Sequence, residues 1–225
     1  MSAVTITPLV QKYKERVTVS KLKYVYTVFK NAERLSVSEY GDVSGWNFYY
    51  SSSDKFNQSF WETYFLPYIK YSPCEYSQRY IYSVSKKGVF RTFQYPAYCL
   101  SDGIVFWGVS IASNGFLIGK KIVFDINGSK GPNIYGKDVF ELYISKPIKK
   151  GAENYADGSY YITPKCPAGL SFCAWGTYHA ADGWYWESDD EVISDCYDSA
   201  GNLNSCGYII QQNSWKIPDN YPIKF

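Results

Sequence analysis

The chain of 225 residues has a formal net charge of +2, and charged residues make up 20% of it without forming a long block of one sign. This composition argues against a nucleic-acid-binding tail and against global disorder. Aromatic residues also reach 20%, whereas the sequence contains one Met and one His. The aromatic content favours a β-rich fold, and the single His removes most metal-hydrolase and catalytic-triad chemistry.

Residues 3–35 are predicted to form one long helix. At about 1.5 Å per residue it would measure roughly 48 Å, longer than most helices of globular domains. Apolar or small side chains recur along it at intervals of three or four, and three more widen the stripe. The recurring positions are Ile6, Val10, Tyr13, Val17, Ser20, Tyr24, Val28, Ala32 and Leu35, and the widening ones are Leu22, Val25 and Phe29.

The same segment is basic. Residues 1–35 contain seven Lys or Arg and two Glu, so that they carry about +5 and the rest of the chain about −3. Two explanations remain open: a solvated helix face, or a basic face that binds the phosphates of lipid or DNA.

The remaining elements follow in chain order. A loop is expected over 36–52, and a short helix from an N-cap at Ser53 or Asp54 to Pro67. A hairpin is predicted over 80–93, followed by strands at 104–109, 117–124 and 139–144. Beyond Ile148 the sequence is irregular and carries four of the six cysteines.

This order predicts an α+β fold in which a long N-terminal helix packs on an antiparallel sheet and disulfides staple the C-terminal region. We expect one domain over 1–225. It would consist of a helical spine (1–35), a head with a short helix and the sheet (36–148), and a Cys-rich C-terminal region (149–225).

The cysteines are Cys74, Cys99, Cys166, Cys173, Cys196 and Cys206. Their even number and the absence of C-x-x-C spacing disfavour a zinc site and favour three disulfides in an exported protein. The alternative is a set of free core thiols in a cytosolic protein. Proximity along the chain favours the pairs Cys166–Cys173 and Cys196–Cys206, which leaves Cys74 with Cys99.

No signal peptide and no apolar run long enough to span a membrane are visible from Met1 onward. For an exported protein we therefore expect that the natural N-terminus was removed and that Met1 starts the expressed chain.

The loop after the 117–124 strand carries candidate metal ligands. Asp125, Asn127 and Asp138, together with loop carbonyls, supply the oxygen ligands that a structural Ca²⁺ would take. The alternative is a strand connector in which Asp125 and Asn127 bond their own turn, with Gly128 and Gly131 at positive φ. No other cofactor is expected.

A phosphate-binding loop is excluded at the same place. Residues 131–137 match G-x-x-x-x-G-K, but Asp138 stands where Mg²⁺ and phosphate need Ser or Thr, and a strand follows instead of a helix.

Three adjacent aromatic residues, Trp184, Tyr185 and Trp186, lie within an acidic stretch. They are candidates for a sugar-stacking or protein-contact surface, or with the acidic residues for a second cation site, whereas the alternative is an ordinary half-buried turn and strand. For Cys173 as a nucleophile, His179 is the only possible imidazole partner, and Cys173 is expected to be oxidised. We therefore do not expect an enzyme.

Four stretches of the chain resemble prepilin-type proteins, namely the type IV pilins and the pseudopilins of type II secretion. They are residues 3–13 with their proline, residues 60–68, the string D-x-N-G-x-K-G-P-N-x-x-G-x-D-x-F over 125–140, and the ending N-S-W-K-I-P-D-N-Y-P over 213–222. The resemblance covers both ends and the centre of the chain, and residues 150–200 carry none of it.

The resemblance implies a structural subunit of a cell-surface pilus or of a periplasmic pseudopilus. Its partners would be other pilin subunits and, before assembly, the inner membrane through a segment upstream of Met1. That segment would carry the leader, the processing site and the methylated start of the mature chain. The stripe of Ile6, Val10, Tyr13 and Val17 would face the filament interior, and residues 24–35 would pack on the subunit's own sheet. The alternative is a minor pilin or adhesin that binds glycan or DNA.

Overall fold

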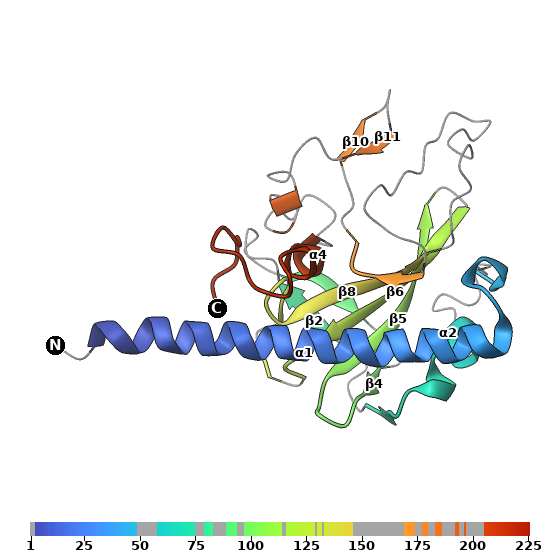
Figure 1. Ribbon diagram of the computed structural model, residues 1–225, viewed down its shortest axis with the longest axis horizontal. Coiled ribbons are helices and arrows are strands. Elements are labelled where there is room, and N and C mark those ends of the chain that lie inside the picture. The colour runs from blue at the N-terminus through green and yellow to red at the C-terminus, as the bar shows by residue number, and fades with distance from the viewer. Residues whose placement is uncertain are drawn as a thin grey trace.

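The computed structural model describes residues 3–48, 58–74, 79–82, 89–93, 97–113, 116–128, 130–131, 133–145, 169–173, 177–179, 183–185, 192–193, 196 and 205–225. A long helix lies along one side of a sheet-containing head, and its N-terminal part extends beyond that head (Figure 1). The α+β fold with a helix on an antiparallel sheet is therefore confirmed.

Helix α1 (Ala3–Tyr40) includes Pro8 near its start and ends five residues after the predicted spine. The predicted end was wrong because Ser36 is fully buried and Val37 is half-buried, so the packed face continues past Leu35. Gly41 ends the helix at φ +78°, where its N–H donates to the Val37 carbonyl at 2.9 Å. The 3₁₀ turn η1 (Val43–Gly45) follows.

The main sheet has six strands in the order β1-β4-β5-β6-β8-β9, and all its pairs are antiparallel. The strands are β1 (Ser72–Pro73), β4 (Tyr98–Cys99), β5 (Val105–Ser113), β6 (Phe116–Asp125), β8 (Val139–Ser145) and β9 (Gly169–Ser171). The three long central strands include the three predicted ones. A second sheet has the order β3-β2-β7, and β10 pairs with β11. These are β2 (Arg79–Tyr82), β3 (Val89–Phe93), β7 (Asn133–Ile134), β10 (Thr177–His179) and β11 (Gly183–Tyr185).

One face of the main sheet packs against α1. Phe29 of α1 meets Phe106 of β5 edge-on with ring centroids 5.1 Å apart, and Phe106 pairs in register with Phe124 of β6. Helix α2 (Gln58–Tyr64) and the 3₁₀ turn η2 (Leu66–Tyr68) close the same core. A Cβ on Gly108 would lie 2.1 Å from the Trp61 indole nitrogen, so glycine lets α2 approach the sheet.

The opposite face of the sheet is buried as well. Because side chains alternate along a strand, Lys121, Glu141 and Tyr143 point away from α1. Lys121 Nζ lies 2.9 Å from Glu141 Oε1, and the Tyr143 hydroxyl donates to Glu141 Oε2 at 2.5 Å. Glu141 is thus a buried carboxylate whose charge is neutralised by Lys121 and which accepts a hydrogen bond from Tyr143.

The C-terminal region contains a helix that the irregular sequence did not indicate. Helix α4 (Ser205–Gln212) contacts β8 and buries Cys206, Ile209 and Ile210. A Cβ on Gly207 would lie 2.2 Å from the Phe172 ring, so this helix depends on the close approach of one aromatic side chain.

Two of the predicted disulfides are confirmed, Cys74–Cys99 and Cys196–Cys206. Cys173 is also disulfide-bonded, whereas Cys166 lies outside the described residues, so the third pairing stays a prediction. The proposed N-cap residues Ser53 and Asp54 and the hairpin turn at 83–88 also lie outside them.

Candidate functional site

Two stripes of side chains run along α1, of which one is buried against the head and the other is mostly exposed. The buried stripe comprises Thr18, Leu22, Val25, Phe29, Ala32, Glu33 and Ser36. Residues 24–35 were expected to pack as one stripe, and this was wrong in part because Tyr24 is 39% exposed and Leu35 is 53% exposed. Tyr24 follows Leu22 by two residues and therefore lies about 200° around the helix from it.

The second stripe is the free stripe, which we define as Val10, Tyr13, Val17, Tyr24, Val28 and Leu35. Tyr13, Tyr24 and Leu35 are separated by 11 residues, or about three helical turns, so they lie on one side. Val10, Val17 and Tyr24 repeat at seven, which is the spacing of helix–helix seams. Val17 and Val28 are half-buried, and the other four members are exposed.

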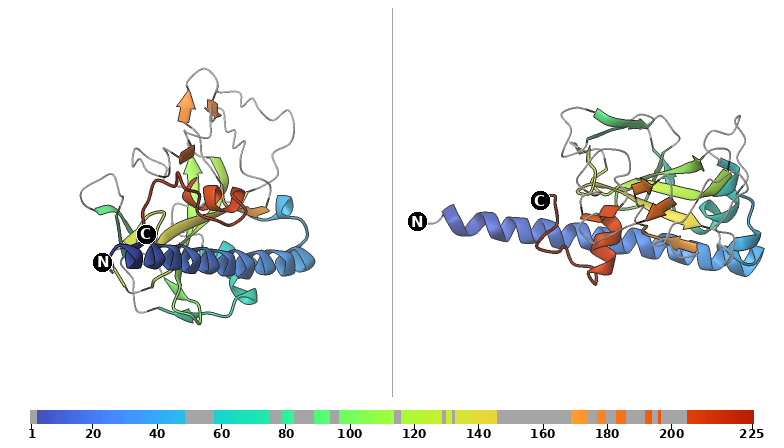
Figure 2. Two further views of the ribbon diagram at one scale, coloured as in Figure 1. Left: turned by 60° about the vertical axis from the view of Figure 1, so that its left-hand side comes forward. Right: turned by 90° about the horizontal axis from the view of Figure 1, so that it is seen from above.

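The exposure of α1 is unusual within this protein. Among the described residues, six of the seven large apolar side chains that are most exposed lie on α1. The N-terminal part of the helix extends beyond the head (Figure 2). Leu9 and Tyr13, near the N-terminal end of α1, are 71% and 68% exposed. An exposed apolar row of this length is typical of a surface that binds another protein or a membrane.

The loop between β6 and β7 forms a turn held by Asp125. Its Oδ1 accepts hydrogen bonds from the backbone N–H groups of Asn127 at 3.0 Å and Gly128 at 3.1 Å. With the Asn133 amide oriented to donate, its nitrogen lies 3.2 Å from Asp125 Oδ2. Gly128 adopts φ +66°, whereas Gly131 does not take the positive φ expected of it.

Asp138 lies beside this turn. Its Oδ2 accepts from the Ile134 N–H at 3.3 Å, and its backbone carbonyl accepts from Ile126 N–H at 2.8 Å. Burial raises the pKa of the Asp138 carboxyl, against the lowering effects of the Ile134 hydrogen bond and the Lys137 charge.

The side chains of Asp125 and Asp138 therefore both accept hydrogen bonds from groups of the loop itself. A Ca²⁺ ion would compete with the N–H donors for the Asp125 oxygens, although the oxygen donor set is one that calcium accepts. Within the described part of the chain, no group of three or more His, Cys, Asp or Glu side chains is placed to hold a metal. Calcium binding by Asp125, Asn127 and Asp138 therefore stays a prediction.

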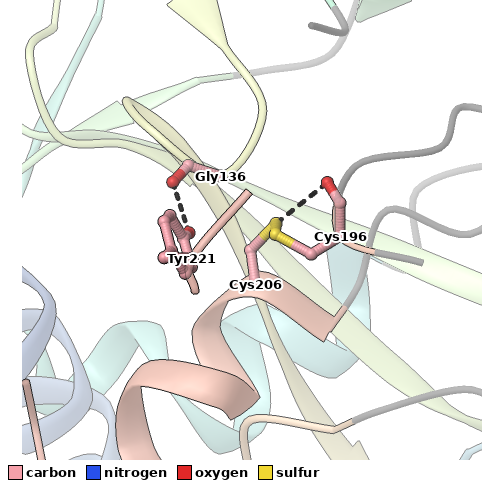
Figure 3. The surroundings of a disulfide bond; sticks show 4 residues. All are labelled: Gly136, Cys196, Cys206 and Tyr221. Atoms are coloured by element: carbon pink, nitrogen blue, oxygen red, sulfur yellow. Dashed lines mark hydrogen bonds between the residues drawn. A yellow bond between two sulfur atoms is a disulfide. The ribbon is translucent and has the colours of Figure 1, made fainter. Parts of the chain in front are cut away.

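The turn that precedes β8 is locked by the C-terminal segment (Figure 3). The Tyr221 hydroxyl donates to the Gly136 carbonyl at 2.6 Å, and the Cys196–Cys206 disulfide lies alongside. A Cβ on Gly136, which has φ +79°, would lie 2.5 Å from Cys206 Sγ and 2.4 Å from Ile223 Cδ1. The resembling strings at 125–140 and 213–222 therefore meet in space, which sequence reasoning did not predict.

The aromatic surface is only partly described. Trp184 and Tyr185 belong to β11, where Trp184 pairs in register with Tyr178 of β10, whereas Trp186 lies outside the described residues. This hairpin lies on the side of the head away from α1 (Figure 1). His179 belongs to β10, and Cys173 is disulfide-bonded, so the thiol needed for nucleophilic chemistry is absent from that residue.

A sequence-family model described as a family of unknown function (DUF6613) matches residues 8–225. The chain belongs to this family. Neither the curated proteins nor the solved structures yielded a match to the DUF6613 chain. Within the described part of this DUF6613 protein, no helix combines the length and apolar character needed to cross a membrane.

Proposed function

We propose that this DUF6613 protein is a structural subunit of a helix-cored filament of the type IV pilus or pseudopilus kind. The observation that carries the proposal is the free stripe of α1, because the subunit's own head covers a different side of the helix. A second copy that presents the same stripe would bury these side chains in a helix–helix seam.

The arrangement of the head supports the same function. Helix α1 extends beyond the head at its N-terminal end, so that part can pack among other helices while the sheet and the C-terminal region stay outside (Figure 2). The Cys74–Cys99 and Cys196–Cys206 disulfides suit a head that works in an oxidising compartment, at the cell surface or in the periplasm. The function is therefore one of assembly rather than catalysis.

The resemblance of residues 3–13, 60–68, 125–140 and 213–222 to prepilin-type proteins is a further support. Two of these segments form one packed unit, in which Tyr221 closes on the loop at Gly136. A glycan- or DNA-binding minor pilin remains the second interpretation, with Trp184, Tyr185 and Trp186 as its candidate glycan surface, and it stays a prediction.

Cysteine cross-linking in cells that make the natural protein tests the proposal. We expect Tyr24→Cys and Leu35→Cys to form disulfide-linked multimers on oxidation, because the free stripes of neighbouring subunits face each other. Lys23→Cys and Arg34→Cys are the matched controls, since each lies one residue before a stripe position and about 100° around the helix from it.

The controls should give mainly monomer under the same conditions. Equal cross-linking at stripe and control positions, or no multimers at any of them, would contradict the assembly of subunits through this stripe.

A further inference from the structure

We infer that a basic collar around α1 binds an anionic lipid bilayer, at the end of the head from which the N-terminal part of the helix extends. The collar consists of seven cationic residues on both flanks of the helix, namely Lys12, Lys14, Arg16, Lys21, Lys23, Lys137 and Lys216. The inference deepens the proposed function, in which the subunit is held at a membrane before assembly.

The first half of the collar surrounds a groove between α1 and the C-terminal segment. The groove has a volume of about 470 Å³ and is lined by Lys12, Arg16, Lys23 and Lys216, with Glu15 as its acid. Glu15 already accepts a hydrogen bond from the Gln11 amide at 3.0 Å. Within the described residues none of the four cations has an ion pair with an acid, so the groove presents uncompensated positive charge.

Trp215 forms one wall of this groove, and its backbone conformation is strained. Ser214 and Trp215 take φ +55° and +61°, a left-handed conformation that non-glycine residues rarely adopt. The Trp215 N–H donates to the Ile210 carbonyl at 2.9 Å, which turns the chain back on helix α4. The indole then packs against Tyr26 with ring centroids 5.5 Å apart and lies under Lys23 Nζ at 5.9 Å.

The second half of the collar surrounds a cavity of about 330 Å³ on the other flank, where Lys14, Lys21 and Lys137 are its cations and Asp138 is its acid. Lys21 Nζ donates to the Ile126 carbonyl at 2.5 Å, and Lys137 Nζ donates to the Lys224 carbonyl at 3.1 Å. Backbone carbonyls thus position both ammonium groups at the edge of the cavity, beside the Asp138 carboxylate.

The collar lies where α1 leaves the head, and exposed apolar side chains come directly before it. Leu9 and Val10 are 71% and 44% exposed and precede Lys12 along the helix. Tyr13, Trp215 and Phe225 line the two grooves at the level of the cations. Exposed apolar residues, followed along the helix by aromatic rings interspersed with Lys and Arg, are typical of a segment at the boundary between the acyl region and the headgroups.

This order favours a bilayer over a nucleic acid. Lys and Arg side chains held near an anionic leaflet each favour binding, and the collar has such cations on both flanks of α1. A nucleic acid would use the cations and the Trp215 ring, but it would not cover the exposed Leu9 side chain.

Sedimentation of the chain with vesicles tests the inference. The vesicles are pure phosphatidylcholine, or equal parts of phosphatidylcholine and phosphatidylglycerol, each at low salt and at about 0.15 M salt. We expect binding to the phosphatidylglycerol vesicles at low salt, weaker binding at the higher salt, and little binding to phosphatidylcholine alone. The double variant Arg16→Glu with Lys23→Glu should lower the apparent affinity by at least about tenfold.

Arg34→Glu with Lys70→Glu is the matched control, because it makes the same charge change at exposed cations outside the collar. It should bind within about twofold of the parent chain, and circular dichroism verifies that both variants fold. Equal loss in the two variants, equal binding to neutral vesicles, or tighter binding to a single-stranded oligonucleotide than to anionic vesicles would overturn the inference.

The cross-linking experiment separates this inference from the proposed function. Stripe cross-links without vesicle binding would refute the collar and leave the filament subunit standing. Vesicle binding without stripe cross-links would refute the filament subunit and leave the collar as a lipid-binding surface.

Discussion

At the scale of single residues, Gly136 occupies a position that only glycine fits. Replacement by alanine combines a strained φ of +79° with contacts of 2.5 Å to Cys206 Sγ and 2.4 Å to Ile223 Cδ1. We expect Gly136→Ala to lower the free energy of unfolding by about 2–4 kcal/mol, as measured by urea denaturation.

Gly103→Ala isolates the backbone contribution to this effect. Gly103 has φ +82° with no atom within 4 Å of the added Cβ, so alanine there should cost about 1 kcal/mol. Equal losses in the two variants would mean that the packing of Gly136 against the disulfide contributes nothing.

A pH effect is expected from Asp42, which begins the turn after α1. Hydrogen bonds from the side chain and the backbone N–H of Ser44 lower the pKa of Asp42 below its ordinary value of 3.8. A carboxyl with a lowered folded pKa stabilises the fold above the unfolded pKa, and this contribution is lost as pH falls through the folded pKa.

Asp42→Asn keeps an N-cap acceptor and removes the titration. Below about pH 4, the parent chain should therefore lose stability faster than the variant, as measured by urea denaturation across the acid range. Parallel pH profiles for the two proteins would rule out this role for Asp42.

At the scale of elements, Glu33 connects α1 to the edge strand β9. Its Oε1 accepts from the buried Leu170 N–H at 2.8 Å, and Lys30 pairs with its other oxygen. The contact is close enough that a Cβ on the adjacent Gly169 would lie 2.3 Å from Glu33 Oε1. A buried acid in the middle of the apolar face of α1 is thus an acceptor for the sheet edge.

Glu33→Ala should lower the free energy of unfolding by about 2–3 kcal/mol, because it leaves a buried N–H without a partner. Glu33→Gln keeps an acceptor oxygen and should cost about 1 kcal/mol. Thermal or urea unfolding measures both, and an alanine variant as stable as the glutamine variant would show that the hydrogen bond to Leu170 is dispensable.

The sequence was most informative for elements with strong local patterns. The strands at 104–109, 117–124 and 139–144 and the hairpin at 80–93 alternate or concentrate apolar residues between turn residues, and each appears in the structure. Helix α4 was missed because its Cys and Gly are poor helix formers, and its stability comes from tertiary burial of Ile209 and Ile210.

The face of α1 that packs on the head was harder to predict. Two apolar stripes share the helix, and periodicity alone does not say which one the sheet covers. The choice is decided by partners far along the chain, such as Phe106 for Phe29 and Leu170 for Glu33. The same limit applies to the collar, where Lys137 and Lys216 join the α1 cations only after folding.

At the scale of the whole molecule, the two proposals assign α1 to two partners, a second subunit and a bilayer, and the two surfaces overlap at Tyr13 and Val17. The stripe extends along the helix to Leu35, whereas the collar is confined to residues 12–23 of α1 and the segments beside them. A subunit that moves from a membrane into a filament would therefore lose its lipid contact at residues 12–23 while the free stripe packs against the helices of other subunits.

The lock between Tyr221 and Gly136 has a consequence for biosynthesis. The two residues are 85 positions apart, and the Cys196–Cys206 bond closes against the same glycine. The loop at Gly136 is therefore secured only after Tyr221 has been translated, and contacts between residues this far apart in the chain form slowly. Until that contact forms, the partly folded chain is expected to be more prone to aggregation than the complete fold.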